Sequence, residues 1–303
     1  IGHYAGHSSQ RRHSVSIGDY AGHSSQHNYC VAIGHNAGHN QHHEHSVAIG
    51  NHAGFNQHSL AVAIGYFAGY STQHGHAVAI GYEAGKENQN AHSIAIGEAA
   101  SYYNQYSHSY SYGYYAGHDH QRSHSIAIGT HAGHEQIRDN AIAIGNHAGY
   151  QHLHNQAIAI GYYAGRNQMD SDSIAIGHHA GYNGLLGHSI AIGYYASNNM
   201  GRNYHRTLVI NATNNTGIRP YHNDSCYINP IRHTDDGGSH MKMLRYNTST
   251  KEITYTNQSG GGGSGGSSDN PVRIGIGSGQ NSQHERDRKS HTSELQSLLW
   301  ISY

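Results

Sequence analysis

The 303-residue chain has little charge, little proline and almost no cysteine. Charged residues make up 12% of it, and there are three Pro, two Cys and two Phe. The formal net charge of −1 gives no support for nonspecific nucleic-acid binding through a basic face. No apolar run approaches the roughly 20 residues that a membrane-spanning helix needs, so we expect no membrane span. The few acidic residues keep no fixed spacing, and no nucleophile elbow, P-loop or His-Glu-x-x-His motif occurs, so we do not expect an enzyme.

Glycine, histidine and tyrosine are abundant instead, with 40 Gly, 33 His and 25 Tyr. Low charge with low hydropathy is typical of disorder, but here the apolar residues keep a strict period. An Ile-Gly step recurs thirteen times between Ile1 and Ile192, with Tyr112-Gly113 as its one variant. Every spacing is 16 residues except one of 15, between Ile49 and Ile64. A short fixed period predicts a solenoid in which each repeat is one rung stacked on its neighbours.

One rung is represented by residues 93–97, Ser-Ile-Ala-Ile-Gly. Two β-branched residues that flank an alanine indicate a short strand with one face buried. We predict that the Ile and Val columns form the core and that the glycine after each Ile is a positive-φ corner. The predicted core residues include Ile17, Ile33, Ile49, Ile94, Ile96, Ile126, Ile128, Ile144, Ile160 and Ile176. The predicted turn glycines include Gly18, Gly34, Gly50, Gly97, Gly129 and Gly145.

The repeated core [Ser/Ala]-[Ile/Val]-Ala-Ile-Gly-x-x-Ala resembles the head repeats of YadA-like trimeric autotransporter adhesins. Repeats with Ala-Gly and an Asn/Gln loop, as in 64–79, are still more similar to the arrays of phage and giant-virus fibre proteins. The resemblance implies a left-handed parallel β-roll that assembles as a trimer and serves as a surface stalk or binding head. The predicted fold is an all-β parallel β-solenoid of about thirteen 16-residue rungs, trimeric and capped by a small β module.

Four segments are expected along the chain. Residues 1–207 are the β-roll repeat domain, 208–257 a β cap or neck module, 258–271 a Gly/Ser linker and 272–303 a tail with a possible short helix. The cap is similar to the module that closes repeat arrays in viral fibres. Because the chain opens inside a repeat, we expect it to be a fragment or a processed product.

Histidine and tyrosine fall into surface columns, for which three interpretations stay open. They form polar-aromatic ladders along the roll, or they recognise a glycan or receptor through ring faces, or they bind a transition metal. The candidate ligand-facing residues are Tyr70, Tyr150, Tyr182, His118 and His134, and the candidate metal ligands are His39, His42, His43 and His45. No other cofactor is expected. Near pH 5–6 adjacent His side chains would charge and repel one another.

The sequence therefore predicts a structural fibre or adhesin-like attachment protein on a virion or cell surface. Its expected partners are copies of itself, as a homotrimer or a higher polymer, and a surface glycan or receptor. The alternatives are a self-assembling extracellular filament with no receptor-binding role and a His-rich assembly that responds to metal or pH.

Overall fold

The computed structural model describes residues 1–198, 204–214, 217–229, 243–246, 249–250 and 253–256. The chain divides into two compact units, Ile1–Ser225 and Cys226–Tyr303. Within the described ranges the structure is all-β and contains no helix. Accordingly, the described part offers no helix that could cross a bilayer. Both cysteines, Cys30 and Cys226, are free.

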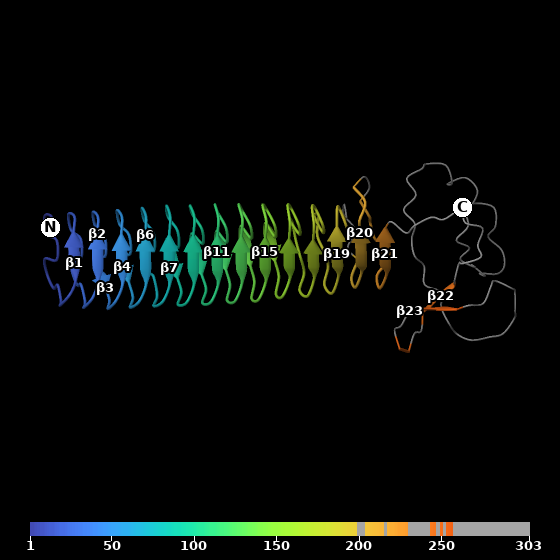
Figure 1. Ribbon diagram of the computed structural model, residues 1–303, viewed down its shortest axis with the longest axis horizontal. Helices are drawn as coiled ribbons and strands as arrows, with labels where there is room; N and C mark the ends of the chain where they lie inside the picture. Colours follow the sequence, from blue (N-terminus) through green and yellow to red (C-terminus); the bar gives the residue numbers. More distant parts are fainter. Residues whose placement is uncertain (199–203, 215–216, 230–242, 247–248, 251–252, 257–303) are drawn as a thin grey trace. The chain divides into compact units, whose positions relative to one another are not determined.

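A long sheet forms one wall of the roll (Figure 1). Its strands from β1 to β20 pair in parallel and in register, so that Ile94 lies opposite Tyr110 and Tyr110 opposite Ile126. Within the first unit the order of the sheet is β1 (Val15–Ile17), β2 (Val31–Ile33), β4 (Val47–Ile49), β6 (Val62–Ile64), β7 (Val78–Ile80), β9 (Ile94–Ile96), β11 (Tyr110–Tyr112), β13 (Ile126–Ile128), β15 (Ile142–Ile144), β17 (Ile158–Ile160), β18 (Ile174–Ile176), β19 (Ile190–Gly193) and β20 (Leu208–Asn211). The second unit begins with β21 (Cys226–Asn229).

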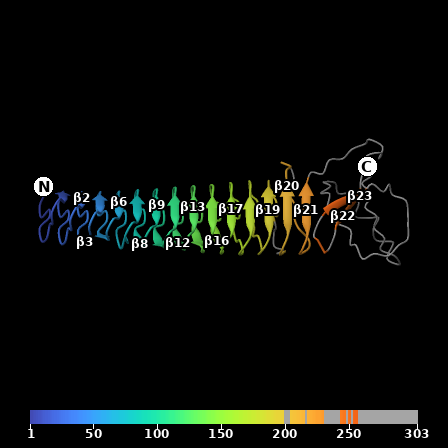
Figure 2. The same cartoon turned by 60° about the horizontal axis from the view of Figure 1, so that its bottom comes forward.

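Short strands on the opposite side of each rung form the second wall (Figure 2). They belong to a five-stranded and a two-stranded sheet, and isolated parallel bridges extend this wall from Gln10 to Leu185. The strands are β3 (Gln41–His42), β5 (Asn56–Gln57), β8 (Glu87–Gln89), β10 (Tyr103–Gln105), β12 (Asp119–Gln121), β14 (Glu135–Ile137) and β16 (Gln151–Leu153). In the second unit, β22 (Met243–Tyr246) and β23 (Ile253–Thr256) form an antiparallel pair.

The prediction of a parallel β-solenoid of about thirteen rungs is confirmed. The 15-residue rung is accommodated without a shift of register, since Val47 still pairs with Val62 and Ile49 with Ile64. The long sheet continues past residue 207, because β20 pairs with β19. The predicted Gly/Ser linker and the C-terminal tail lie outside the described residues.

Alanine, not isoleucine or valine, lines the interior of the long sheet, which corrects the predicted core. In each three-residue strand the middle residue is buried: Ala95 is 0% exposed, whereas Ile17 and Ile128 on the other face are 40% exposed. A strand sends its first and third side chains to the same face, and here that face points out of the roll. The correction covers Ile17, Ile33, Ile49, Ile94, Ile96, Ile126, Ile128, Ile144, Ile160 and Ile176, none of which is buried within the chain.

The narrowness of the roll explains why its interior takes alanine. A methyl group built on Gly85, in the turn that faces β7, would already lie 3.4 Å from the Cβ of Ala79. The alanine of the turn, Ala84, is also fully buried. The second wall sends a large buried side chain into successive rungs, such as Gln89, whose Nε2 reaches the carbonyl of Val78. The long sheet therefore has room only for alanine opposite it.

The glycine after each Ile is a positive-φ corner at which neighbouring rungs approach closely. The predicted turn glycines have φ of 121° at Gly18, 127° at Gly34, 130° at Gly50, 129° at Gly97, 122° at Gly129 and 125° at Gly145. A Cβ on Gly145 would lie 2.7 Å from the carbonyl oxygen of Gly161 in the next rung. Both the backbone conformation and the space therefore require glycine.

A ladder of buried glutamine side chains fills the interior of the N-terminal half. The Nε2 of Gln57 donates to Gln73 Oε1 at 2.9 Å, Gln73 to Gln89 at 3.0 Å, Gln89 to Gln105 at 3.0 Å and Gln105 to Gln121 at 3.3 Å. Each Nε2 also donates to a backbone carbonyl of the long sheet, as Gln89 does to Val78 at 2.8 Å. We name the five residues Gln57, Gln73, Gln89, Gln105 and Gln121 the Gln ladder.

Beyond Gln121 the same interior column becomes aliphatic. It continues as Ile137, Leu153, Met169 and Leu185, all at most 2% exposed. Two serines mark the end of the Gln ladder: Ser111 donates to Gln121 Oε1 at 2.5 Å and accepts from Ser101 at 2.8 Å. Ser101 replaces a repeat glycine and Ser111 a repeat alanine, so these departures from the repeat provide hydrogen bonds where the polar interior stops.

His42 interrupts the same column before Gln57. Its ring is 0% exposed, and neither ring nitrogen has a partner with hydrogen-bonding geometry, nor has Gln57 Oε1. Burial lowers the pKa of His42 to about 4, although the neighbouring Gln57 side chain and the Ser46 carbonyl oppose that change. His42 is thus a neutral imidazole in a position where glutamine would continue the ladder.

Candidate interaction surfaces

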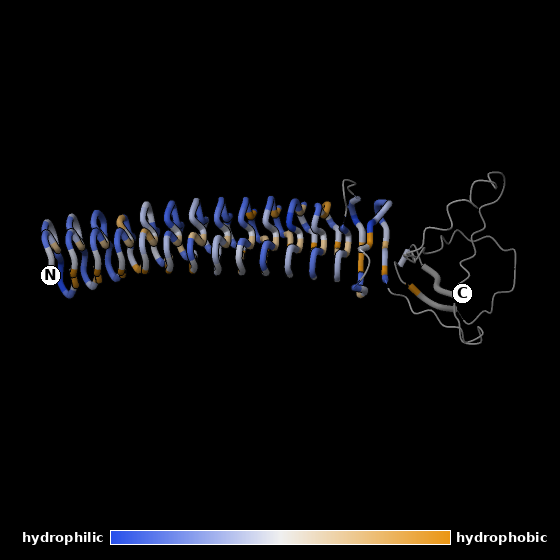
Figure 3. Tube along the Cα trace, turned by 90° about the horizontal axis from the view of Figure 1, so that it is seen from above, coloured by the Kyte–Doolittle hydropathy of each residue, from blue (hydrophilic) through white to orange (hydrophobic). Residues whose placement is uncertain are grey.

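The outward face of the long sheet carries a long apolar stripe. We define the apolar stripe as the first and third residues of the strands from Val15 and Ile17 to Ile190 and Ile192. Among them Val15 is 42% exposed, Ile176 37% and Ile192 38%. Figure 3 shows the hydrophobic residues recurring from rung to rung along a largely hydrophilic trace. Neither column of the stripe contains a charged residue.

The stripe changes character at one rung. In β11 the outward residues are Tyr110 and Tyr112, which are 42% and 61% exposed; we name this pair the Tyr rung. The backbone of β11 stays in register with both neighbouring strands. The Tyr rung is therefore a local change in side-chain size and polarity on an otherwise regular face.

Aromatic rings stack along the outer corners of the roll. Successive rings lie about one rung apart, as in His118–His134 (5.0 Å between centroids, 3° between planes) and His134–Tyr150 (4.9 Å, 12°). Arg166 continues this column between Tyr150 and Tyr182, with its guanidinium 5.6 and 5.5 Å from their centroids. These contacts are the polar-aromatic ladders along the roll that the sequence predicted as one interpretation of the His and Tyr columns.

The stacking leaves few ring faces for a ligand. Of the five candidate ligand-facing residues, His118 and His134 stack on each other, Tyr150 lies between His134 and Arg166, and Tyr182 contacts Arg166. Tyr70 meets Phe55 at 5.2 Å. All five are half-buried, and the face of a ring is the part that a sugar would stack on. The columns therefore present mainly ring edges.

Positive-φ corners explain much of the histidine content. The column His76, His92, His108 and His124 has φ between 58° and 61°, and its rings stack at 4.7, 5.0 and 5.1 Å. Among residues other than glycine, His, Asn and Asp are enriched in this conformation. The same column continues with Asn140 and Asp172, also at positive φ, so the backbone conformation accounts for its composition.

The four candidate metal ligands occupy four different places. His42 points into the roll, His39 stacks on His23 and Phe55, His43 stacks on His58, and His45 stacks on Tyr29. The structure does not bring these side chains together. Among all the described residues, no group of three or more His, Cys, Asp or Glu is placed to hold a metal ion.

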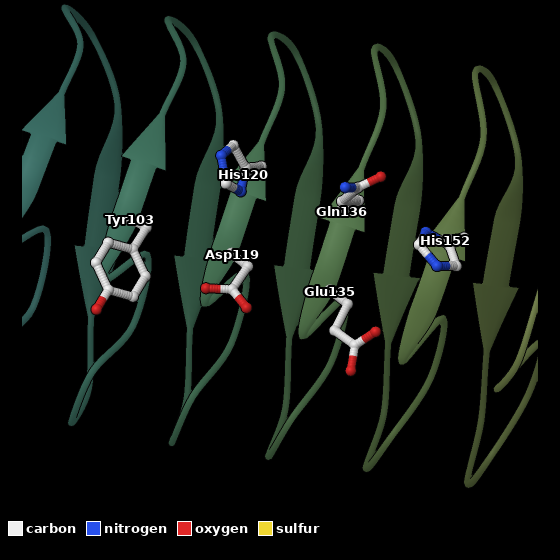
Figure 4. Close-up of a pocket in the computed structure, with 6 residues that line it drawn as sticks. All are labelled: Tyr103, Asp119, His120, Glu135, Gln136 and His152. Atoms are coloured by element: carbon white, nitrogen blue, oxygen red, sulfur yellow. The ribbon is translucent and has the colours of Figure 1, made fainter.

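A hollow of about 460 Å³ lies on the outer face of the five-stranded sheet, lined by Tyr103, Asp119, His120, Glu135, Gln136 and His152. Figure 4 shows two rows, with Tyr103, Asp119 and Glu135 in one and His120, Gln136 and His152 in the other. Asp119 and Glu135 are register partners on adjacent strands, and His118 Nδ1 lies 3.0 Å from Asp119 Oδ1. The repeat period did not single out this site, because these residues share a strand position but not a residue type.

Burial lowers the pKa of several ring nitrogens on the roll. At His118 burial is opposed by Asp119, and at His134 burial is reinforced by the charge of His118. His131 and His147 shift in the same direction for the same first cause. Each of these rings therefore loses its proton more readily than a free imidazole does.

Comparison with known proteins gives no match: no family model, no curated protein and no solved structure is similar to this chain.

Proposed function

We propose that this chain is a structural fibre or attachment protein of a virion or cell surface, in which copies of the roll associate as a homotrimer through the apolar stripe. The observation that carries the proposal is the stripe itself. Two rows of Ile and Val, replaced by Tyr only in β11, face outward from β1 to β19, and such contiguous exposed apolar surface is typical of an interface. The resemblance to adhesin and viral-fibre repeats supports the same assembly.

The size of the stripe supports an interface. Twelve strands carry the stripe, so at about 4.8 Å per strand it is on the order of 50 Å long, and three residues span about 10 Å. The face is thus roughly 500 Å² in plan, of the same order as the 800 Å² or so that each partner buries in a stable complex.

The period of the stripe favours a second copy of the chain over an unrelated partner. The apolar pairs repeat once per rung, at about 4.8 Å, and a partner can match them over the full length only if it has the same period. A copy of the roll has that period, and it brings no charge to the interface.

The experiment is sedimentation velocity on the full chain and on the variant Ile96→Lys with Ile144→Lys. We expect the full chain to sediment as three copies and the variant as one copy, because two lysines would be desolvated without partners in the interface. Both side chains face outward in the single chain, so the circular dichroism spectrum should not change.

The matched control is Asn88→Lys with Gln136→Lys, which adds the same charge at exposed positions of the second wall. This control should remain trimeric. A full chain that sediments as a monomer, or a stripe variant that keeps the mass of the wild type, would contradict the proposal. A long polymer in place of three copies would favour the filament alternative.

A further inference from the structure

A strictly periodic interface does not define one axial alignment. If two copies slide past each other by one rung, every remaining Ile and Val pair meets an equivalent pair, and only the contacts of a terminal rung are lost. The columns differ slightly along the roll, since Val78 and the rungs before it carry Val where Ile94 and later rungs carry Ile. A one-rung shift would mismatch this boundary at a single level by one methylene group. The aliphatic part of the stripe therefore discriminates weakly between registers.

The Tyr rung breaks this degeneracy. Tyr112 is the most exposed residue of the stripe at 61%, and Tyr110 is 42% exposed. Their strand is fixed from the inside, because Ser111 donates to Gln121 Oε1 at 2.5 Å and accepts from Ser101 at 2.8 Å. The two phenol rings thus project from a backbone that is held in register with its neighbours.

We propose that the Tyr rung sets the axial register in which copies of this chain associate, and so selects a closed trimer over a staggered polymer; this inference rests on the proposed self-association. When all copies are level, the phenol rings meet in one layer. When a copy is shifted by a rung, Tyr110 and Tyr112 of each copy face Ile pairs of the other. Large rings then overpack two levels of the interface, and the phenol hydroxyls face an apolar surface.

Register decides whether the assembly closes. Three copies around an axis use head-to-tail contacts, and such contacts form a closed ring only when there is no translation along the axis. A translation of one rung at each contact leaves unmatched ends that add further copies. One specific rung can therefore decide whether the chains form a closed particle or an open filament. A single polar residue fixes the register of a coiled coil in the same way.

The test compares the full chain with Tyr110→Ile plus Tyr112→Ile, which restores the repeat residues and should fold. Sedimentation velocity reports the mass. A reporter, Ile160→Cys in a Cys226→Ser background, reports the register, because copies that are level place position 160 of each copy around the axis. We expect the wild-type reporter to give one trimeric species that cross-links through the introduced thiols with a short bis-maleimide. The double variant should give a broad distribution of larger masses and an at least five-fold lower yield of that cross-link.

Two further variants make the comparison specific. Tyr114→Ile removes a 44% exposed tyrosine outside the stripe and should behave as the wild type. Adding Ile142→Tyr and Ile144→Tyr to the double variant moves the Tyr rung two rungs along and should restore a single trimeric species. If the double variant keeps the wild-type mass and cross-link yield, or if it becomes monomeric, the register role is overturned while the self-association of the wild type stands. A monomeric wild type would overturn both.

Discussion

The interior of the roll differs between its two halves, although their outer repeat is the same. From Gln57 to Gln121 the central column is a hydrogen-bonded amide ladder, and from Ile137 to Leu185 it is aliphatic. Both halves keep the same strand register and the same corner glycines.

The difference shows that the backbone of the rung accommodates either a polar or an aliphatic interior residue, provided that the interior residues of neighbouring rungs are of the same kind. An amide in the ladder uses its oxygen for the rung before and its nitrogen for the rung after, so each member depends on two neighbours. An aliphatic side chain requires only that its neighbours are apolar. The two kinds meet after Gln121, where no further amide accepts from its Nε2. This nitrogen donates instead to the backbone carbonyls of Tyr110 and Ser125.

The largest effect is expected from a charge in the ladder. Gln89→Glu keeps the shape but removes the donor to Val78 and Ser93, and it places a carboxylate against their carbonyl oxygens. We expect a loss of about 3–5 kcal/mol in the free energy of unfolding, as for an uncompensated buried charge. Denaturant unfolding measures it. The control Gln136→Glu, on the exposed outer face, should stay within about 0.5 kcal/mol of the wild type.

Acid should weaken the N-terminal half more than the C-terminal half. The pKa of His42 is about 4 in the fold and about 6.5 in the unfolded chain, so the unfolded state binds a proton first as the pH falls. Its contribution is complete above pH 6.5 and is lost between pH 6.5 and 4, up to about 3 kcal/mol. Burial lowers the pKa of partly buried histidines in both halves, such as His39 and His134, so the difference between the halves depends on His42.

Hydrogen exchange at pH 7.5 and pH 5 measures this difference rung by rung. We expect the rungs around β3 and β5 to lose protection before those around β14 and β16. The variant His42→Gln should lose much of the pH dependence. A melting temperature that is the same at pH 8 and pH 5 would show that buried neutral histidine does not control stability.

Replacing one interior residue by the other kind should lower the free energy of unfolding by less than a buried charge does. Leu153→Gln places an amide oxygen between Ile137 and Met169, neither of which offers a hydrogen-bond donor. Gln89→Leu removes the Nε2 that donates to Gln105 Oε1. Each leaves one buried acceptor unpaired, for which we expect about 1–3 kcal/mol. The control Leu153→Met matches Met169 in type and should cost less than about 1.5 kcal/mol. Thermal melts of the three variants give the order, and equal costs for Leu153→Gln and Leu153→Met would argue against the distinction.

The smallest effect, and a favourable one, is expected from completing the ladder. At pH 8, His42→Gln should stabilise the chain by about 1 kcal/mol, because the new Nε2 can donate to Gln57 Oε1. The midpoint of denaturant unfolding measures the gain. A loss of stability would mean that the ring of His42 fills space that an amide cannot.

The period of the sequence predicted the rungs, the parallel pairing and the glycine corners, because each depends only on which residues recur. It did not predict which face of the strand points inward. In Ile94-Ala95-Ile96 the alternation is compatible with either face, and a shift by one residue exchanges inside and outside. Hydrophobicity alone favours Ile inside, but the large side chains of the second wall, such as Gln105, already fill the interior and leave space only for Ala95.

The Gln ladder had a signal that sequence reasoning missed. Gln73, Gln89, Gln105 and Gln121 recur every 16 residues, as regularly as the glycines, in a polar segment whose composition is typical of a loop. A polar residue that never varies over successive rungs indicates a structural partner. His42 and Ile137 in the same column show where that partnership is absent.

The mass of the full chain in solution at neutral pH tests the central claim most directly, because the outward apolar stripe is the basis of the proposed fibre. One chain is 32.9 kDa. Light scattering on the purified chain should give a single species of three times that mass, stable to dilution. A species with the mass of one chain at micromolar concentration would contradict the account, since the apolar stripe would then be exposed without a copy to cover it.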